Sequence, residues 1–375
     1  MQDRFTQLYS KPFQLFRLKG FFYEYSITFH KFILLSRIHS HSILNQTPAI
    51  MKKLYFLLPF IFLACKSSTT TTSEKDSQSN SKPIVINYKV SETEISDFLK
   101  YLSSDDMEGR ETGTKGIEKA AVFLEDFLKK NNIKPYFKTY RDTLTNFKSP
   151  AFNIVGVIEG TDPELKKEYV VLSAHYDHIG IEKKEQADKI NNGANDDASG
   201  VTAVAAIGKY FSETKSNKRS ILIVFFAGEE KGLLGSKSLV EKLKKQNFNL
   251  YTQLNIEMIG VPMKRDYLAY VTGFDKSNMA DKINEYTGKK TIGFLPKEAE
   301  YQLFYRSDNY SFFQAFEKPC QSISTFDFEN FDFYHHVSDE FKLMDIPHIT
   351  SFTQELLPAV TKIAVTPTQE ITMKK

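Results

Sequence analysis

Short apolar runs that alternate with helical patterns are the feature that most constrains this fold. The runs, which are mostly β-branched or aromatic, cover residues 153–158, 169–174, 221–227 and 254–258. Stretches with apolar residues at helical spacing lie between them, at 201–211 and 233–245. Strands that are apolar throughout are buried on both faces, and the intervening helices cover those faces. The pattern therefore predicts an α/β fold: a single domain, roughly residues 88–366, with a central mixed, largely parallel β-sheet flanked by helices.

Two further helices are predicted ahead of the first run. Ser91 and Glu94 form a capping box, in which the two side chains bond free backbone N–H groups at the start of a helix. A second helical pattern extends from Ile117 to Leu128. Residues 367–375 come after this domain and are predicted to be a tail.

Acidic and imidazole side chains follow the apolar runs at the points where these end. Taken singly, each such segment is better explained as a solvated loop than as a functional site. In an open α/β sheet, however, ligands bind in the crevice outside the carboxyl ends of the strands, so we expect these side chains to converge. Converging carboxylates repel one another unless a cation lies among them, and imidazole with carboxylate suits zinc or a related divalent ion. The segments are 175–178 (His-Tyr-Asp-His), 195–200 (Asn-Asp-Asp-Ala-Ser-Gly), 228–230 (Gly-Glu-Glu), Glu257 and 334–339 (Tyr-His-His-Val-Ser-Asp).

Charge balance and cysteine content argue against a nucleic-acid-binding protein and against a disulfide-rich one. The 375 residues carry a net charge of +3 without a basic block interleaved with aromatic residues, so nucleic acid is not expected as a partner. Two cysteines, Cys65 and Cys320, cannot form a disulfide framework. Cys320 has no activated base near it in the sequence and is predicted to be a buried, small apolar residue.

The first part of the chain is predicted to lie outside the folded domain. Residues 51–65 have a basic start, a short apolar run and a final Cys65, which is typical of a bacterial lipoprotein signal that leaves the cysteine lipidated. Residues 1–50 would then lie upstream of the true start, and the polar residues 66–87 would form a flexible tether. The prediction is an exported, periplasmic or cell-surface protein, lipid-anchored to a bacterial membrane. A plain signal peptide or an N-terminal anchor is the alternative.

The motifs, taken in order, resemble a known family. They begin at 102–110 (Leu-Ser-Ser-Asp-Asp-Met-Glu-Gly-Arg) and 113–116 (Gly-Thr-Lys-Gly), and continue through the His-x-Asp, Asn-Asp-x-x-Ser-Gly, Gly-Glu-Glu and Tyr-His-x-x-x-Asp segments. In order and spacing, over most of residues 95–345, they resemble the co-catalytic zinc exopeptidases of metallopeptidase family twenty-eight. This family includes bacterial aminopeptidases and glutamate carboxypeptidase. The resemblance implies a zinc-aminopeptidase-like (phosphorylase/hydrolase-like) fold.

The resemblance also implies a site for two zinc ions. One ion would be bound by His175 and Glu257, and the other by Glu230 and His335. Asp196 would bridge the two ions at a separation of ~3.5–4 Å. Most relatives have Asp where this chain has Glu257, which has the same charge and donor atoms on a side chain one methylene longer.

Further residues take roles by the same resemblance. Glu229 would be the general base, and Asp177 would orient the imidazole ring of the first ligand. The peptide bond before Asp197 can be cis in relatives, so a cis bond is expected there. His178 and His336 are interpreted as groups that support the ligands or the local structure, because the expected ligand set is already complete.

Two other segments bear on substrate recognition. Ser307-Asp308-Asn309 resembles a Ser-Asp-His segment of the family but lacks the histidine, which leaves substrate specificity open. The aromatic stretch before the last ligand could line an apolar side-chain pocket, although core packing is expected for most of it. Its members are Phe326, Phe328, Phe331, Phe333 and Tyr334.

The predicted function is that of a metal-dependent exopeptidase acting on peptides. An aminopeptidase is favoured because a free substrate amine can sit near the acidic cluster, but a carboxypeptidase stays open, as does the oligomeric state. A glutaminyl-cyclase-like acyltransferase on the same fold is an alternative that uses one zinc. A metal-free binding ectodomain is another, and it would have lost metal ligands that this chain retains.

Overall fold

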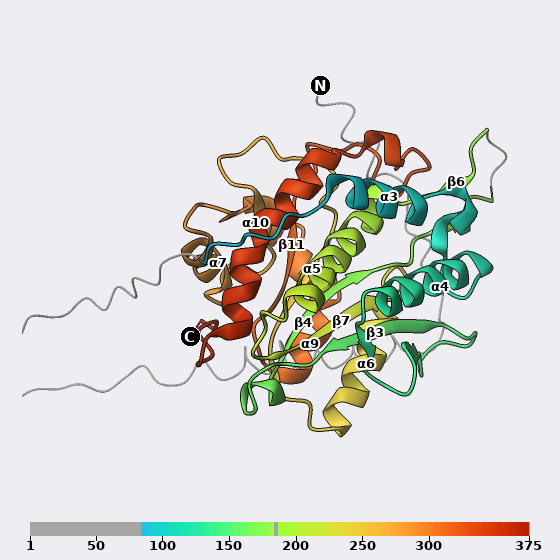
Figure 1. The fold of residues 1–375 in the computed structure, drawn as a ribbon. Helices are drawn as coiled ribbons and strands as arrows, with labels where there is room; N and C mark the ends of the chain where they lie inside the picture. Colours follow the sequence, from blue (N-terminus) through green and yellow to red (C-terminus); the bar gives the residue numbers. More distant parts are fainter. Residues whose placement is uncertain (1–83, 184–186, 375) are drawn as a thin grey trace, which may run out of the picture. The chain divides into compact units, whose positions relative to one another are not determined.

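The structure is a computed structural model that describes residues 84–183 and 187–374 (Figure 1). The predicted upstream segment, the predicted signal with Cys65 and most of the predicted tether lie outside the described residues. Within the described part of the chain, no helix combines the length and the apolar character needed to cross a membrane.

A mixed nine-stranded sheet forms the centre of the domain, in the order β1-β3-β7-β4-β8-β11-β9-β10 with β2 paired to β3 (Figure 1). The inner strands β7, β4, β8 and β11 are parallel, which confirms the predicted largely parallel sheet. β3 lies antiparallel to β7, so the first apolar run points the opposite way to the others. The strands are β1 Lys134–Pro135, β2 Arg141–Thr143, β3 Phe152–Ile158, β4 Tyr169–His175, β7 Ser220–Phe226, β8 Leu250–Ile256, β9 Ala269–Val271, β10 Ile292–Gly293 and β11 Cys320–Ser324, with a separate hairpin of β5 Gly180–Ile181 and β6 Ile190–Asn191.

Helices cover both faces of this sheet. The helical patterns expected from the sequence correspond to α3, α4, α5 and α6, and the side chain of Ser91 caps α3 by accepting from the N–H of Glu94. The α-helices are α3 Glu92–Leu102, α4 Lys115–Lys130, α5 Gly200–Thr214, α6 Leu234–Lys245, α7 Met279–Thr287, α8 Pro296–Glu300, α9 Asn309–Phe316 and α10 Ile346–Val365. The tighter 3-10 turns are Asp105–Arg110, Leu165–Lys167, Leu303–Tyr305 and Phe341–Leu343, and a π-type turn spans Ala194–Ser199.

Alternate residues of the strands contribute side chains to two apolar cores, one on each face of the sheet. On β4, Val170 and Leu172 belong to the core that includes α3, α4, α5 and α10. Val171, between them, belongs to the core that includes Leu239 of α6 and Phe312 of α9. Successive side chains of a strand point to opposite faces, so a strand that is apolar at every position must be covered on both. The continuous apolar runs of the sequence have this physical cause.

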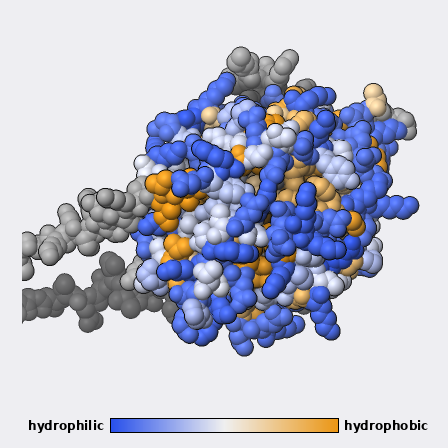
Figure 2. All heavy atoms as spheres, in the orientation of Figure 1, coloured by the Kyte–Doolittle hydropathy of each residue, from blue (hydrophilic) through white to orange (hydrophobic). Residues whose placement is uncertain are grey.

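The ends of the described chain pack onto the domain. Residues 84–87, assigned to the tether in the sequence, include Ile86, which packs against the larger core. The stretch after α10, predicted as a tail, also packs: Ile371 is buried and its N–H donates to the hydroxyl of Tyr251 at 2.9 Å. The face shown in Figure 2 is largely hydrophilic, with apolar residues gathered in small groups.

Candidate metal centre

The inner parallel strands bring the predicted site residues to one edge of the sheet. His175 is the last residue of β4, Glu229 and Glu230 follow β7, and Glu257 follows β8 directly. These strands are parallel, so their carboxyl ends meet, as the sequence pattern predicted. Asp196 enters from the turn that precedes α5.

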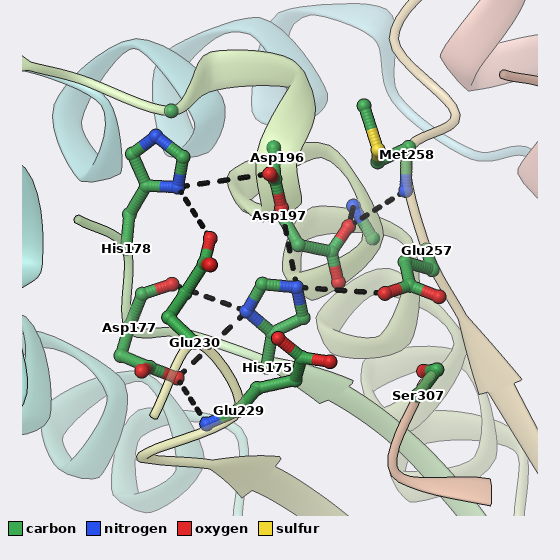
Figure 3. Close-up of polar contacts among 12 residues, drawn as sticks. His175, Asp177, His178, Asp196, Asp197, Glu229, Glu230, Glu257, Met258 and Ser307 are labelled. Atoms are coloured by element: carbon green, nitrogen blue, oxygen red, sulfur yellow. Dashed lines mark hydrogen bonds and ion pairs between the residues drawn. The ribbon is translucent and has the colours of Figure 1, made fainter. Parts of the chain in front are cut away.

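Asp196 lies at the centre of this cluster (Figure 3). Its Oδ1 is 3.3 Å from Nε2 of His175, and its Oδ2 is 3.3 Å from Nε2 of His335. Nε2 of His175 is also 3.7 Å from Oε1 of Glu257. Nε2 of His335 is 3.0 Å from Oε2 of Glu230. The five side chains expected to hold metals therefore form two groups that share one carboxylate.

Their charges make this arrangement costly without a cation. Burial raises the pKa of Glu257 to about 7, and the neighbouring Asp196 adds to that rise. Burial lowers the pKa of His335, but hydrogen bonds to Asp196 and Glu230 outweigh burial and raise it to about 10. Carboxylate oxygens and imidazole nitrogens separated by 3.0–3.7 Å match the edges of a zinc coordination polyhedron with bonds of ~2.0–2.2 Å. The residues present fit a dication.

Glu229 lies beside the cluster and has a separate set of contacts. Its N–H donates to Oδ1 of Asp177 at 3.1 Å, and the other oxygen of Asp177 accepts from the hydroxyl of Thr112 at 2.9 Å. Asp177 reaches the ring of His175 mainly through its backbone carbonyl, which is 3.1 Å from Nδ1, while its carboxylate lies at 3.8 Å. Burial, reinforced by Glu257 and other carboxylates, raises the pKa of Glu229 well above its ordinary value.

The turn that carries Asp196 is held by two neighbouring carboxylates. Asp339 accepts from the N–H groups of Asn195 and Asp196, at 2.8 and 3.0 Å. Asp197 accepts from the N–H of Met258, the residue after Glu257, at 2.8 Å. The Asp196–Asp197 peptide bond is cis, as expected. These contacts fix Asp196 relative to the ends of β8 and the last ligand segment.

Arg110 links three backbone segments of the same region through hydrogen bonds, a role that the sequence did not predict. Its guanidinium is fully buried and donates to the carbonyls of Tyr176, Leu102, Asn192 and Gly193 at 2.5–2.9 Å. Burial lowers its pKa to about 10, against the opposing effect of nearby aspartates, so the side chain stays charged at neutral pH. A buried charge that satisfies backbone oxygens of three segments holds them in fixed relation.

A cleft of about 510 Å³ opens beside the cluster. Asp196, Glu229, Glu230 and Glu257 lie at its acidic end. Its apolar wall contains Met258, Tyr270, Leu303, Phe326, Phe328 and Tyr334.

The aromatic stretch before His335 contributes both to the cleft and to the core, and Cys320 is a core residue. Phe326, Phe328 and Tyr334 line the cleft, and all of the stretch except Tyr334 packs in or against the core. Cys320 is buried, as predicted, and burial raises the pKa of its thiol.

His178 and His336, the two imidazoles beside the predicted ligands, have different surroundings. Nδ1 of His178 is 3.0 Å from Oε1 of Glu230, within the cluster. His336 is exposed, and its Nδ1 accepts from the N–H of Ser338 at 3.1 Å.

Fold and site together define an α/β protein with a buried carboxylate and imidazole centre suited to a dication. The profile of peptidase family M28 matches residues 153–360, more than half of the chain, and the chain belongs to that family.

Curated relatives match over limited regions. A probable zinc metalloprotease of Pyrenophora tritici-repentis is 36% identical over 109 residues, which are 28% of this chain and 24% of that protein. Aminopeptidase YwaD of Bacillus subtilis is 26% identical over 143 residues, covering 38% of this chain and 29% of the relative. The chain thus spans less than a third of the length of these relatives.

Solved structures share the fold over most of the domain. The LapA aminopeptidase of Legionella pneumophila superposes with a TM-score of 0.57 at 20% identity, over 74% of this chain and 73% of that one. A glutaminyl cyclase of Bacteroides thetaiotaomicron superposes with a TM-score of 0.55 at 18% identity, over 73% of this chain and 98% of that one. At these identities the likeness establishes the fold.

Proposed function

We propose that this chain is a zinc-dependent aminopeptidase with two zinc ions. The observation that carries the proposal is the position of Asp196, whose two carboxylate oxygens each lie 3.3 Å from a different imidazole. A carboxylate placed in this way can bridge two dications. The first ion would be held by His175, Asp196 and Glu257, and the second by His335, Asp196 and Glu230.

The reaction needs a base that is close to the metals but is not a ligand. Bound zinc supplies a Lewis acid that polarises the scissile carbonyl and lowers the pKa of an attacking water. Glu229 borders the cleft next to Glu230, within reach of a water at the metals, and burial raises its pKa well above the ordinary value of a carboxyl group. Glu229 would take a proton from the attacking water and deliver it to the leaving amine. Asp177 holds the backbone of Glu229 and the ring of His175 in the geometry that this transfer requires.

The cleft suits the N-terminal residue of a peptide. Its acidic end would attract the free α-amine of the substrate, and its wall of Met258, Phe326 and Phe328 would receive an apolar side chain. The relatives named as aminopeptidases are consistent with this direction of cleavage.

A panel of substrates tests the proposed function. We expect the zinc-loaded protein to hydrolyse leucyl and phenylalanyl anilides faster than glutamyl anilide, because the wall of Met258, Phe326 and Phe328 favours an apolar side chain. N-acetylated anilides should be resistant, since they lack the free amine. Release of residues only from the C-terminus of unblocked peptides would reject the aminopeptidase assignment in favour of a carboxypeptidase.

A glutaminyl cyclase remains the second candidate because such an enzyme shares the fold over nearly its whole length. That reaction would use one zinc and would form pyroglutamate from an N-terminal glutamine. Incubation with a glutaminyl peptide, followed by mass spectrometry, distinguishes the loss of ammonia from the release of free glutamine. Loss of ammonia as the main reaction would favour the cyclase.

We further propose that the protein is exported and lipid-anchored through Cys65, on the basis of the signal-like residues 51–65. Expressed in a bacterial host, the wild-type chain should incorporate labelled fatty acid and fractionate with membranes. The Cys65→Ala variant should do neither. Equal labelling of both chains would rule out lipidation at this position.

A further inference from the structure

His178 is a buried imidazole within the cluster that is not among the five predicted metal ligands. Its Nδ1 lies 3.0 Å from Oε1 of Glu230 and 3.8 Å from Oδ2 of Asp196 (Figure 3). It comes from the segment just after β4, whereas Glu230 comes from the segment just after β7. A contact of 3.0 Å between these groups is an ordinary hydrogen-bond length.

The ring of His178 is held in one place by its surroundings. Its side chain is fully buried, and its backbone N–H donates to the carbonyl of Arg110 at 3.2 Å. Gly193 lies against the ring: a Cβ there would be 2.6 Å from the Cγ atom of His178. Only a residue without a side chain fits this approach, so the ring and the turn leading to Asp196 are packed together.

The two oxygens of Glu230 have different neighbours because of this ring. Oε1 faces Nδ1 of His178, and Oε2 faces Nε2 of His335 at 3.0 Å. A carboxylate free to rotate could present either oxygen, or both, to a bound ion. With Oε1 engaged by a fixed donor, one oxygen is left for the ion.

Direct ligation by His178 is the alternative, because potential ligand atoms of His178, Asp196 and Glu230 all lie within 4.8 Å of one another. His335 lies nearer to Asp196 than His178 does, with separations of 3.3 and 3.8 Å from the same Oδ2 atom. Asp196, Glu230 and His335 already supply the three protein ligands that are usual for catalytic zinc, which keeps a further position open for substrate or water. A fourth protein ligand would close that position.

We propose that His178 is a positioning residue for the second metal: its Nδ1–H donates to Oε1 of Glu230 and thereby directs Oε2 to the ion. The proposal rests on the proposed two-zinc function but concerns metal affinity alone. Partners that orient a metal ligand in this way typically contribute 10–100-fold in affinity. Loss of the donor should therefore weaken the second zinc by about 10–100-fold and leave the first unchanged.

Zinc titration of apoprotein by calorimetry tests this with two variants at the same position. His178→Phe keeps a buried ring but removes the donor, and we expect one of the two binding events to weaken about 10–100-fold. His178→Asn places an amide N–H where Nδ1 stood, and we expect it to retain most of the wild-type affinity. His348→Asn, which alters an imidazole on α10 outside the cluster, is the matched control and should bind zinc as the wild type does.

A double-mutant cycle with Glu230→Gln separates a specific contact from a general disturbance. If His178 acts through Glu230, His178→Phe should cause little additional loss in the Glu230→Gln background. Undiminished binding of both ions by His178→Phe would overturn the proposal. Equal losses in His178→Phe and His178→Asn, with a changed visible spectrum of the cobalt-substituted protein, would also overturn it and assign direct ligation. Wild type that binds two ions without peptidase activity would reject the proposed function but not this inference.

Discussion

Glu229→Gln is expected to lower kcat by about 10²–10⁴-fold, the usual contribution of a general base. Glutamine has nearly the same shape but cannot accept the proton of the attacking water. Glu229 is placed by the hydrogen bond from its own N–H to Asp177, a contact that the substitution leaves intact. The variant should therefore keep its fold, its zinc content and a KM close to that of the wild type. Steady-state kinetics on an aminoacyl anilide, with metal analysis of the same preparation, measures all of these.

The matched control is Glu241→Gln, the same chemical change at an exposed position of α6. Its kcat should equal that of the wild type. If Glu229→Gln turned over substrate as fast as this control, the assignment of Glu229 as general base would be wrong. A parallel loss of zinc in Glu229→Gln would instead make Glu229 a ligand.

Asp196→Asn should have the second large effect, because one side chain serves both halves of the centre. The amide keeps the shape of the carboxylate but removes its charge. It also replaces one of the two oxygens that could coordinate a metal by an NH₂ group, which does not coordinate. We expect zinc binding to weaken by more than the 10–100-fold typical of residues that only orient a ligand, and activity to fall accordingly. Zinc at about 1,000 times its Kd stabilises a folded protein by about 4 kcal/mol, so chelation should lower the Tm of the wild type but hardly that of the variant.

Asp142→Asn provides the comparison for Asp196→Asn, since Asp142 is also a buried aspartate but pairs with Lys242 away from the cluster. It should lose stability while keeping its zinc and its response to chelator. Should Asp196→Asn bind zinc like the Asp142 variant, the bridging role would have to be abandoned.

The strand pattern predicted the centre of the sheet but not its edges. Runs such as 221–227 are apolar at every position because both faces are covered, and this signal does not depend on strand direction. The antiparallel direction of β3 was therefore not visible in the sequence. β11 was missed because its buried residues are partly polar. Gln321 and Ser322 donate hydrogen bonds to Thr272 and Asn309, which lie 49 and 13 residues earlier in the chain.

The site was more predictable than its supports. His175 ends a buried strand and Glu230 and Glu257 come after two others, so their convergence follows from the topology of a parallel sheet. The supporting role of Arg110 was not predictable, because its partners are backbone carbonyls, which leave no mark on residue identity. Asp339 belongs to the Tyr-His-x-x-x-Asp motif of residues 334–339, but its contact with the turn of Asp196 depends on tertiary structure.

The number of zinc ions per chain tests the central claim most directly. Apoprotein should be titrated with zinc, and bound metal should be counted by elemental analysis after removal of the excess. The shared carboxylate of Asp196 predicts two ions per chain, with activity rising as the second is bound. A single ion that gives full activity would contradict the two-metal account and favour a centre built on His175 or His335 alone.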